Sequence, residues 1–128
     1  VLEGCEYCFM EVSSHAIHQN RISSLVFEGG VFTNITHEHL DYHKDFKEYI
    51  SVKKRFFNDL QNSAFALTNI DDKNGNVMIS NTKAKKITYS LKRMANYKCK
   101  VIESRLDGML LNIQNHEIWV KMLIYSQS

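Results

Sequence analysis

Glu11-Val-Ser-Ser-His15 and Thr33-Asn-Ile-Thr-His-Glu-His-Leu-Asp-Tyr-His43 are the two stretches around which the rest of this chain is organised. Each follows an apolar, strand-like run and replaces it with hydroxyl, amide, imidazole and carboxylate groups. The second leads into residues 46–60, whose apolar positions recur with helical spacing. The sequence therefore predicts strands that deliver chemically active side chains to one edge of a sheet.

Strand-like and helix-like segments alternate through the first two thirds of the chain. We expect strands at residues 7–12, 25–27, 30–33 and 64–69, with a break at Gly29-Gly30, and helices near 15–21, 46–60 and 77–81. Ser13 or Ser14, and Asp45, are expected helix caps. The alternation predicts an α/β fold with a parallel sheet over residues 1–85. Residues 86–125 predict a small antiparallel meander with tight turns.

Composition excludes several classes of protein. At 128 residues and 44% hydrophobic content, the chain is one domain or part of one. A net charge of +2 without a basic cluster among aromatic residues predicts no nucleic-acid partner. No apolar run approaches the ~20 residues of a membrane span, so we expect no membrane partner. The sparse cysteines, Cys5, Cys8 and Cys99, indicate a reducing compartment, and a strand would point the Cys5 and Cys8 side chains to opposite faces.

Two regions contain candidate metal ligands. Glu11 is expected at the end of a buried strand, where its carboxylate needs an ion-pair partner or a cation such as Mg²⁺. The loop after residue 36 is rich in Zn²⁺ ligands, although an inserted tyrosine interrupts the H-x-H-x-D-H spacing of metallo-β-lactamase-like hydrolases. Its four candidate side chains are His37, His39, Asp41 and His43. A metal-binding module or metallohydrolase therefore remains an alternative function, beside a polar surface loop without a metal.

Lys53 is the candidate for a reactive amine. It falls on the helix face of Tyr49, Ile50 and Phe56, whereas Lys54 and Arg55 fall on the solvated side. Partial burial makes a lysine easier to deprotonate, and the neutral amine is the form that reacts. The five glycines do not form a G-x-x-x-x-G-K-[ST] phosphate-binding loop, because none precedes a lysine.

Taken together, these residues resemble the central domain of the Mur ligases, the family that builds the peptide of bacterial peptidoglycan. The resemblance is carried by residues 10–16, Gln19, Arg21 and residues 31–43, 49–53 and 68–72, and residues 86–125 match more loosely. It is greatest for the members that add the third amino acid to UDP-N-acetylmuramoyl-L-alanyl-D-glutamate. Another Mur-type ligase or a folylpolyglutamate synthetase-like ligase is the alternative within this chemistry.

The resemblance implies a role for each matching position. Glu11 and His39 match metal-binding positions, and Lys53 matches the lysine that family members carry as a carbamate beside the metal. Three positions match those that hold the UDP-N-acetylmuramoyl dipeptide: Ser13, Gln19 and Arg21. The family further implies ATP and Mg²⁺ as cofactors. Diaminopimelate or lysine is the implied incoming amino acid, joined to the substrate through an acyl phosphate.

The resemblance also predicts what lies outside this chain. The phosphate-binding loop is expected before Val1, and the domain that recognises the incoming amino acid is expected after Ser128. We therefore expect part of a central ATPase domain from a monomeric enzyme of the bacterial cytoplasm. The 128-residue chain alone is expected to lack ligase activity.

Overall fold

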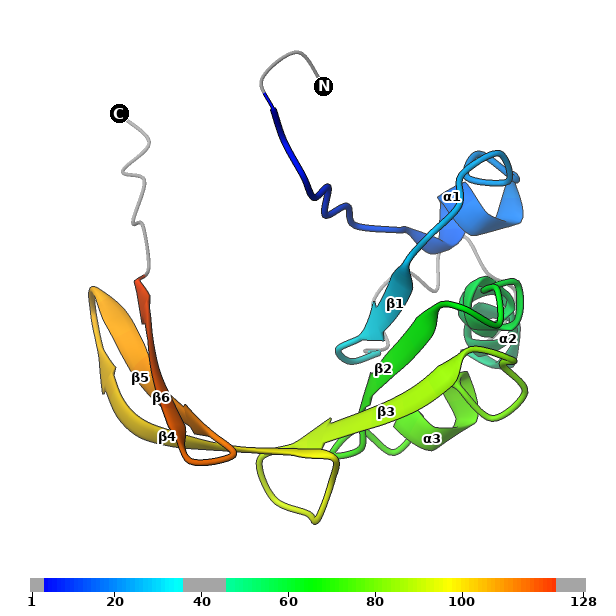
Figure 1. The fold of residues 1–128 in the computed structure, drawn as a ribbon. Helices are drawn as coiled ribbons and strands as arrows, with labels where there is room; N and C mark the ends of the chain where they lie inside the picture. Colours follow the sequence, from blue (N-terminus) through cyan, green and yellow to red (C-terminus); the bar gives the residue numbers. More distant parts are fainter. Residues whose placement is uncertain (1–3, 36–45, 122–128) are drawn as a thin grey trace.

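Six strands form one curled sheet, with helices packed against its first half (Figure 1). The computed structural model describes residues 4–35 and 46–121. The strands are β1 (Gly29–Phe32), β2 (Phe65–Asn69), β3 (Lys85–Ser90), β4 (Tyr97–Arg105), β5 (Gly108–Ile113) and β6 (His116–Lys121). The helices are α1 (Ser14–His18), α2 (Phe46–Asn58) and α3 (Gly75–Met78). The predicted α/β class is confirmed.

The sheet changes from parallel to antiparallel along its length. β1, β2 and β3 are parallel, with Val31 opposite Leu67 and Leu67 opposite Ile87. β4, β5 and β6 form the predicted antiparallel meander. The predicted division at residue 86 assigns β3 to the meander, but β3 pairs in parallel with β2 because α3 carries the chain back between them. The end of β3 also pairs in parallel with the beginning of β4, with Tyr89 opposite Tyr97.

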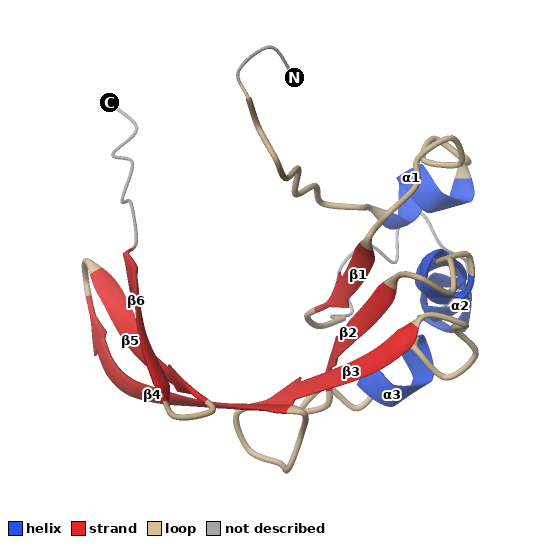
Figure 2. Cartoon of the chain, in the orientation of Figure 1, coloured by secondary structure: helices blue, strands red, loops and turns tan. Residues whose placement is uncertain are grey.

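The helices cover one face of the parallel strands, and the core lies between them (Figure 2). Phe32, Phe57 and Met78 are buried there. A Cβ atom on Gly30 would lie 2.6 Å from the ring of Phe56, so glycine allows α2 to pack closely on β1. Gly29 and Gly30 are therefore part of a strand, and the predicted break between two strands is wrong.

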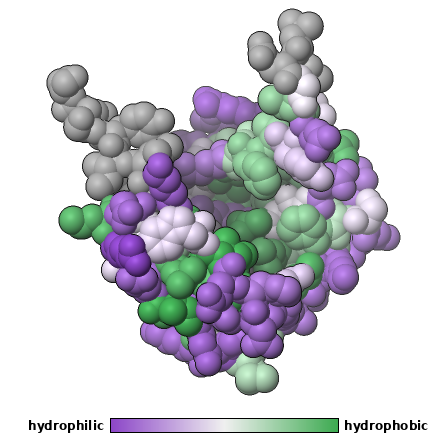
Figure 3. Space-filling model, turned by 60° about the vertical axis from the view of Figure 1, so that its left-hand side comes forward, coloured by the Kyte–Doolittle hydropathy of each residue, from purple (hydrophilic) through white to green (hydrophobic). Residues whose placement is uncertain are grey.

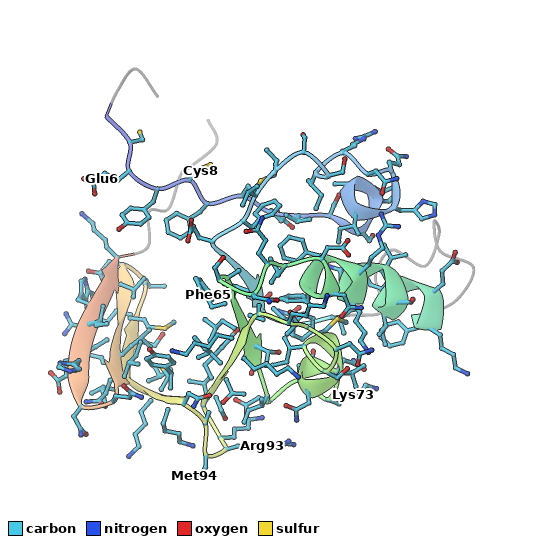
Figure 4. All side chains as sticks on the ribbon, turned by 45° about the vertical axis from the view of Figure 1, so that its right-hand side comes forward. Glu6, Cys8, Phe65, Lys73, Arg93 and Met94 are labelled. Atoms are coloured by element: carbon cyan, nitrogen blue, oxygen red, sulfur yellow. The ribbon has the colours of Figure 1, made fainter. Side chains whose placement is uncertain are left out.

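The opposite face of the sheet lies inside the curl. Apolar side chains are visible within the hollow of the molecule in Figure 3. Phe65, at the start of β2 and labelled in Figure 4, is 38% exposed. In the described part of the chain, no helix has the length and apolar character needed to cross a membrane.

Three predicted elements differ from the structure. Residues 7–12 form no strand, and Tyr7 and Phe9 are 79% and 93% exposed. Apolar composition suggested a buried strand, but β1 is the outer strand of the sheet and residues 7–12 do not pair with it. Residues 25–27 also lie outside any strand, and the helix predicted at 77–81 begins and ends earlier, as α3.

Candidate functional site

A cavity of about 390 Å³ lies beside β1. The segment before α1 forms one wall, β1 and the residues after it form a second, and α2 forms a third. The polar lining residues are Cys8, Glu11, Thr33, Asn34 and Lys53. Cys8, labelled in Figure 4, is exposed, as is Cys5, and both are free thiols. The cavity thus brings together residues from the two stretches that the sequence singled out.

Lys53 meets the expectation of a partly buried amine. Its Nζ atom lies 5.4 Å from the centroid of the Tyr49 ring, on the apolar face of α2. Burial lowers the pKa of Lys53 below its ordinary value, and the negative charge of Glu11 opposes this shift to a smaller extent. Lys53 therefore releases its proton more readily than a solvated lysine.

Glu11 reaches the cavity in a different way from the one predicted. It was expected at the end of a buried strand, but it is exposed and lies on no strand. Its negative charge is nevertheless close enough to Lys53 to offset part of the lowering of that amine's pKa. Because Glu11 is solvated, its charge needs no buried partner, and a carboxylate open to solvent remains available to a hard cation.

The predicted dipeptide-binding residues lie at the two ends of α1. Ser13 caps the helix, and its Oγ accepts a hydrogen bond of 3.2 Å from the Ala16 amide, as predicted. Gln19 is the C-terminal cap, and the Arg21 amide donates to the Ala16 carbonyl at 2.9 Å. The side chains of Ser13, Gln19 and Arg21 are exposed.

Side chains also tie together the carboxyl ends of the parallel strands. Asn69 donates from Nδ2 to the Thr33 carbonyl at 2.9 Å and accepts from the Asp71 amide at 2.9 Å. Asp72 Oδ2 accepts from the Ile35 amide at 3.0 Å. Thr33, Asn69 and Asp71 therefore lie at this edge as predicted, whereas Glu11 follows no strand.

Asp71 joins this edge to the end of β3. Its Oδ1 accepts from the Ser90 hydroxyl at 2.7 Å, and its Oδ2 accepts from the Leu91 amide at 2.7 Å. The Ser90 hydroxyl bond is the main reason that the pKa of Asp71 lies below its ordinary value. Nearby, burial raises the pKa of the Tyr89 hydroxyl, with a smaller contribution from the charge of Asp71.

The histidine-rich loop lies outside the described residues. The structure therefore does not place the predicted zinc or magnesium ligands His37, His39, Asp41 and His43, nor the predicted cap Asp45. Within residues 4–35 and 46–121, no group of three or more His, Cys, Asp or Glu side chains could hold a metal ion. Glu11 supplies a carboxylate oxygen, and a carbamate on Lys53 would supply more, so these two residues fit a share in binding Mg²⁺.

Two residues with clear contacts were missed by sequence reasoning. Arg55 is exposed, as expected, but its Nη2 also donates to the Ile17 carbonyl at 2.6 Å, a contact that was not predicted. Helical spacing gave no signal for this contact, because it identifies a face and not the reach of a long side chain. Asp72 did carry a signal, since it closes the run Thr68-Asn-Ile-Asp-Asp72 directly after a strand.

Comparison with known proteins identifies the family. The family model described as the Mur ligase middle domain matches residues 1–127, and the chain therefore belongs to the Mur ligase family through this domain. The chain is 56% identical, over 121 residues, to a protein of Bacteroides thetaiotaomicron named UDP-N-acetylmuramoyl-L-alanyl-D-glutamate--2,6-diaminopimelate ligase; the match covers 94% of this chain and 25% of that protein. A protein of Parabacteroides distasonis with the same name is 58% identical over 117 residues, which is 91% of this chain and 24% of that one.

A solved structure agrees with the sequence matches. It is titled as the structure of UDP-N-acetylmuramoyl-L-alanyl-D-glutamate--2,6-diaminopimelate ligase and superimposes with a TM-score of 0.70 at 29% identity. The superposition covers 86% of this chain and 24% of that one. The chain thus spans about a quarter of the length of the curated relatives it matches.

Proposed function

We propose that this chain is the middle-domain part of an ATP- and Mg²⁺-dependent ligase, a UDP-N-acetylmuramoyl-tripeptide synthetase. The proposed reaction joins diaminopimelate to UDP-N-acetylmuramoyl-L-alanyl-D-glutamate, and relatives at 56% and 58% identity bear names that specify this amino acid. Diaminopimelate is therefore favoured over lysine. The structural observation that carries the proposal is the cavity of about 390 Å³ in which Glu11 and Lys53 meet.

The proposed chemistry begins at Lys53. Its lowered pKa increases the share of neutral amine, whose lone pair can attack the carbon of CO₂. A nitrogen–carbon bond forms, the nitrogen loses one proton to water, and the product is an anionic carbamate. Lys53 then presents oxygen atoms in place of a cation, in the cavity that the Glu11 side chain also lines.

The carbamate and Glu11 would together hold Mg²⁺, and His39 is proposed as a third ligand. Mg²⁺ and ATP, when bound, supply the phosphoryl group and neutralise its charge. The proposed role of this chain is to position Mg²⁺ and ATP. A carbamate on Lys53 and the carboxylate of Glu11 would repel each other, so a cation bound between them would stabilise the pair.

The proposed substrate side is formed by the residues around α1. Arg21 is suited to an anionic group of the UDP-linked dipeptide, because its guanidinium presents several donors in a fixed plane. Gln19 adds an amide, and the Ser13 hydroxyl both caps α1 and faces solvent. We further propose that the complete enzyme acts as a monomer in the bacterial cytoplasm.

Turnover by the complete protein tests the proposal. Purified protein should convert UDP-N-acetylmuramoyl-L-alanyl-D-glutamate, diaminopimelate and ATP to the tripeptide product, ADP and phosphate, with one phosphate released per product as measured by mass spectrometry and a phosphate assay. Lysine in place of diaminopimelate should give little product. Absence of product with either amino acid would contradict the proposed function.

A further inference from the structure

We propose that Arg55 is a positioning residue that fixes the turn bearing Gln19 and Arg21 onto the helix bearing Lys53, and thereby sets the affinity for the UDP-linked substrate. The inference rests on the proposed function. It concerns a contact between two parts of the site that the sequence does not connect.

The contact is made by one guanidinium. Arg55 Nη2 donates to the Ile17 carbonyl at 2.6 Å, and it also donates to the Asn20 side-chain oxygen. Ile17 is in α1 and Asn20 follows it, so these bonds join segments that are 38 and 35 residues apart in sequence. Arg55 comes from the same helix as Lys53. The two sides of the proposed site are therefore connected through α2.

The turn after α1 has an unusual backbone at the point of contact. Asn20 has a φ of 54°, in the left-handed region that few residues other than glycine adopt, although asparagine is among the more tolerant. Gln19 and Arg21 flank it directly. Movement at Asn20 would therefore move both proposed substrate-binding side chains.

Several backbone hydrogen bonds also hold this turn. The Gln19 amide donates to the His15 carbonyl and the Arg21 amide donates to the Ala16 carbonyl, each at 2.9 Å. The Asn20 amide donates to the Ile17 carbonyl at 3.1 Å, and the Ser23 amide donates to the Asn20 carbonyl at 3.2 Å. Arg55 adds side-chain bonds from α2: it shares the Ile17 acceptor with the backbone and reaches the Asn20 side chain.

A second cavity, of about 250 Å³, lies behind the turn. Ile17, Asn20 and Arg55 are in its lining, together with Phe27 and Phe56. A segment that backs onto open space is not held by close packing, and its position depends more on hydrogen bonds. Loss of the Arg55 contacts should therefore let the turn shift while the core beneath it stays packed.

Arginine is suited to this position because its planar guanidinium presents several donors at fixed angles and can serve two acceptors together. A lysine has a single ammonium group on a flexible stem and would be expected to replace only part of the contact. The comparison of arginine with lysine therefore separates the geometry of the contact from its charge.

Steady-state kinetics of the complete protein test this inference. Arg55→Ala should raise KM for UDP-N-acetylmuramoyl-L-alanyl-D-glutamate roughly tenfold, as expected for loss of about 1.4 kcal/mol of positioning. KM for ATP should change less than about twofold. Arg55→Lys should lie between Arg55→Ala and wild type. Lys47→Ala is the matched control, because it removes a positive charge from an exposed position of the same helix.

Asn20→Ala provides a second route to the same contact. It should raise the same KM, and the Arg55→Ala/Asn20→Ala double variant should match Arg55→Ala alone, because the second change removes a partner that is already lost. Millimolar guanidinium should restore part of the affinity in Arg55→Ala and have no such effect on the wild type. Melting temperatures measured alongside identify any variant that does not fold.

Each other outcome counts against the inference. Unchanged KM in Arg55→Ala and Asn20→Ala, equal losses for ATP and the UDP-linked substrate, or additive effects in the double variant would overturn it while leaving an active wild-type enzyme. Wild-type protein without ligase activity would instead contradict the proposed function on which the inference rests.

Discussion

Asp72 holds the segment that follows β1: its Oδ2 accepts a 3.0 Å hydrogen bond from the amide of Ile35, which lies 37 residues earlier in the chain. The other carboxylate oxygen, Oδ1, accepts from the Asn74 amide at 2.7 Å and so shapes the turn before α3. One side chain therefore fixes both the point at which the chain leaves β1 and the turn that follows β2.

Replacing Asp72 with alanine should destabilise this edge of the sheet. Two backbone amides lose a charged acceptor, for which we expect a cost of about 1–3 kcal/mol in the free energy of unfolding. Hydrogen exchange should increase at the Ile35 and Asn74 amides, as measured by mass spectrometry on the complete protein. Lys73→Ala is the control, because Lys73 is exposed near α3 (Figure 4). Equal exchange in the two variants would contradict this role.

Asp71 should make stability depend on acid. Its pKa is lowered in the folded state, chiefly by the Ser90 hydroxyl bond, from an ordinary value of 3.8. As pH falls, Asp71 is therefore protonated in the unfolded chain before it is protonated in the folded protein. The stabilisation by Asp71 is complete above pH 3.8 and is lost as pH falls through the folded pKa. In Asp71→Asn, the melting temperature should therefore depend less on pH below about pH 4. A profile parallel to that of wild type would contradict this, and Asp59→Asn serves as an exposed control.

Lys53 should also make stability rise with pH, but in the alkaline range. Burial lowers its folded pKa below the ordinary 10.5, so the folded state loses its proton first and stability rises as pH increases from the folded pKa toward 10.5. Lys53→Met should remove this rise and increase stability at neutral pH. Melting curves in carbonate-free buffer measure it, since a carbamate would change the charge. A rise that persists in Lys53→Met would show that another group is responsible.

Gly75 should tolerate no side chain. A Cβ atom there would lie 2.0 Å from the Asn69 carbonyl oxygen, which is a backbone atom and cannot rotate away. The Gly75 carbonyl also accepts from the buried Thr68 hydroxyl at 2.8 Å. Gly75→Ala should therefore cost about 1–3 kcal/mol through overpacking, measured as a lower melting temperature. Asn76→Ala, at the next and exposed position, should have little effect, and equal stability of the two variants would refute the steric account.

The sequence predicted the elements whose patterns are local. The periodicity of residues 46–60 located α2 and placed Lys53 on its apolar face, and the turns at residues 106–107 and 114–115 located the meander. The strand at residues 7–12 was predicted wrongly, because apolar composition cannot show whether a neighbouring strand pairs with it. Contacts of Arg55 with Ile17 and of Asp72 with Ile35 join residues far apart in sequence, and no local pattern encodes such pairs.

Lys53, in its cavity with Glu11, is proposed to serve the ligation chemistry. Phosphate release by the complete protein, measured with ATP, UDP-N-acetylmuramoyl-L-alanyl-D-glutamate and diaminopimelate, tests it in Lys53→Ala against Lys54→Ala, the neighbouring lysine on the same helix. Lys53→Ala should lose at least about 100-fold in kcat, the scale of losing one group that stabilises transition-state charge, while Lys54→Ala should stay near wild type. Equal rates in the two variants would contradict this role of Lys53.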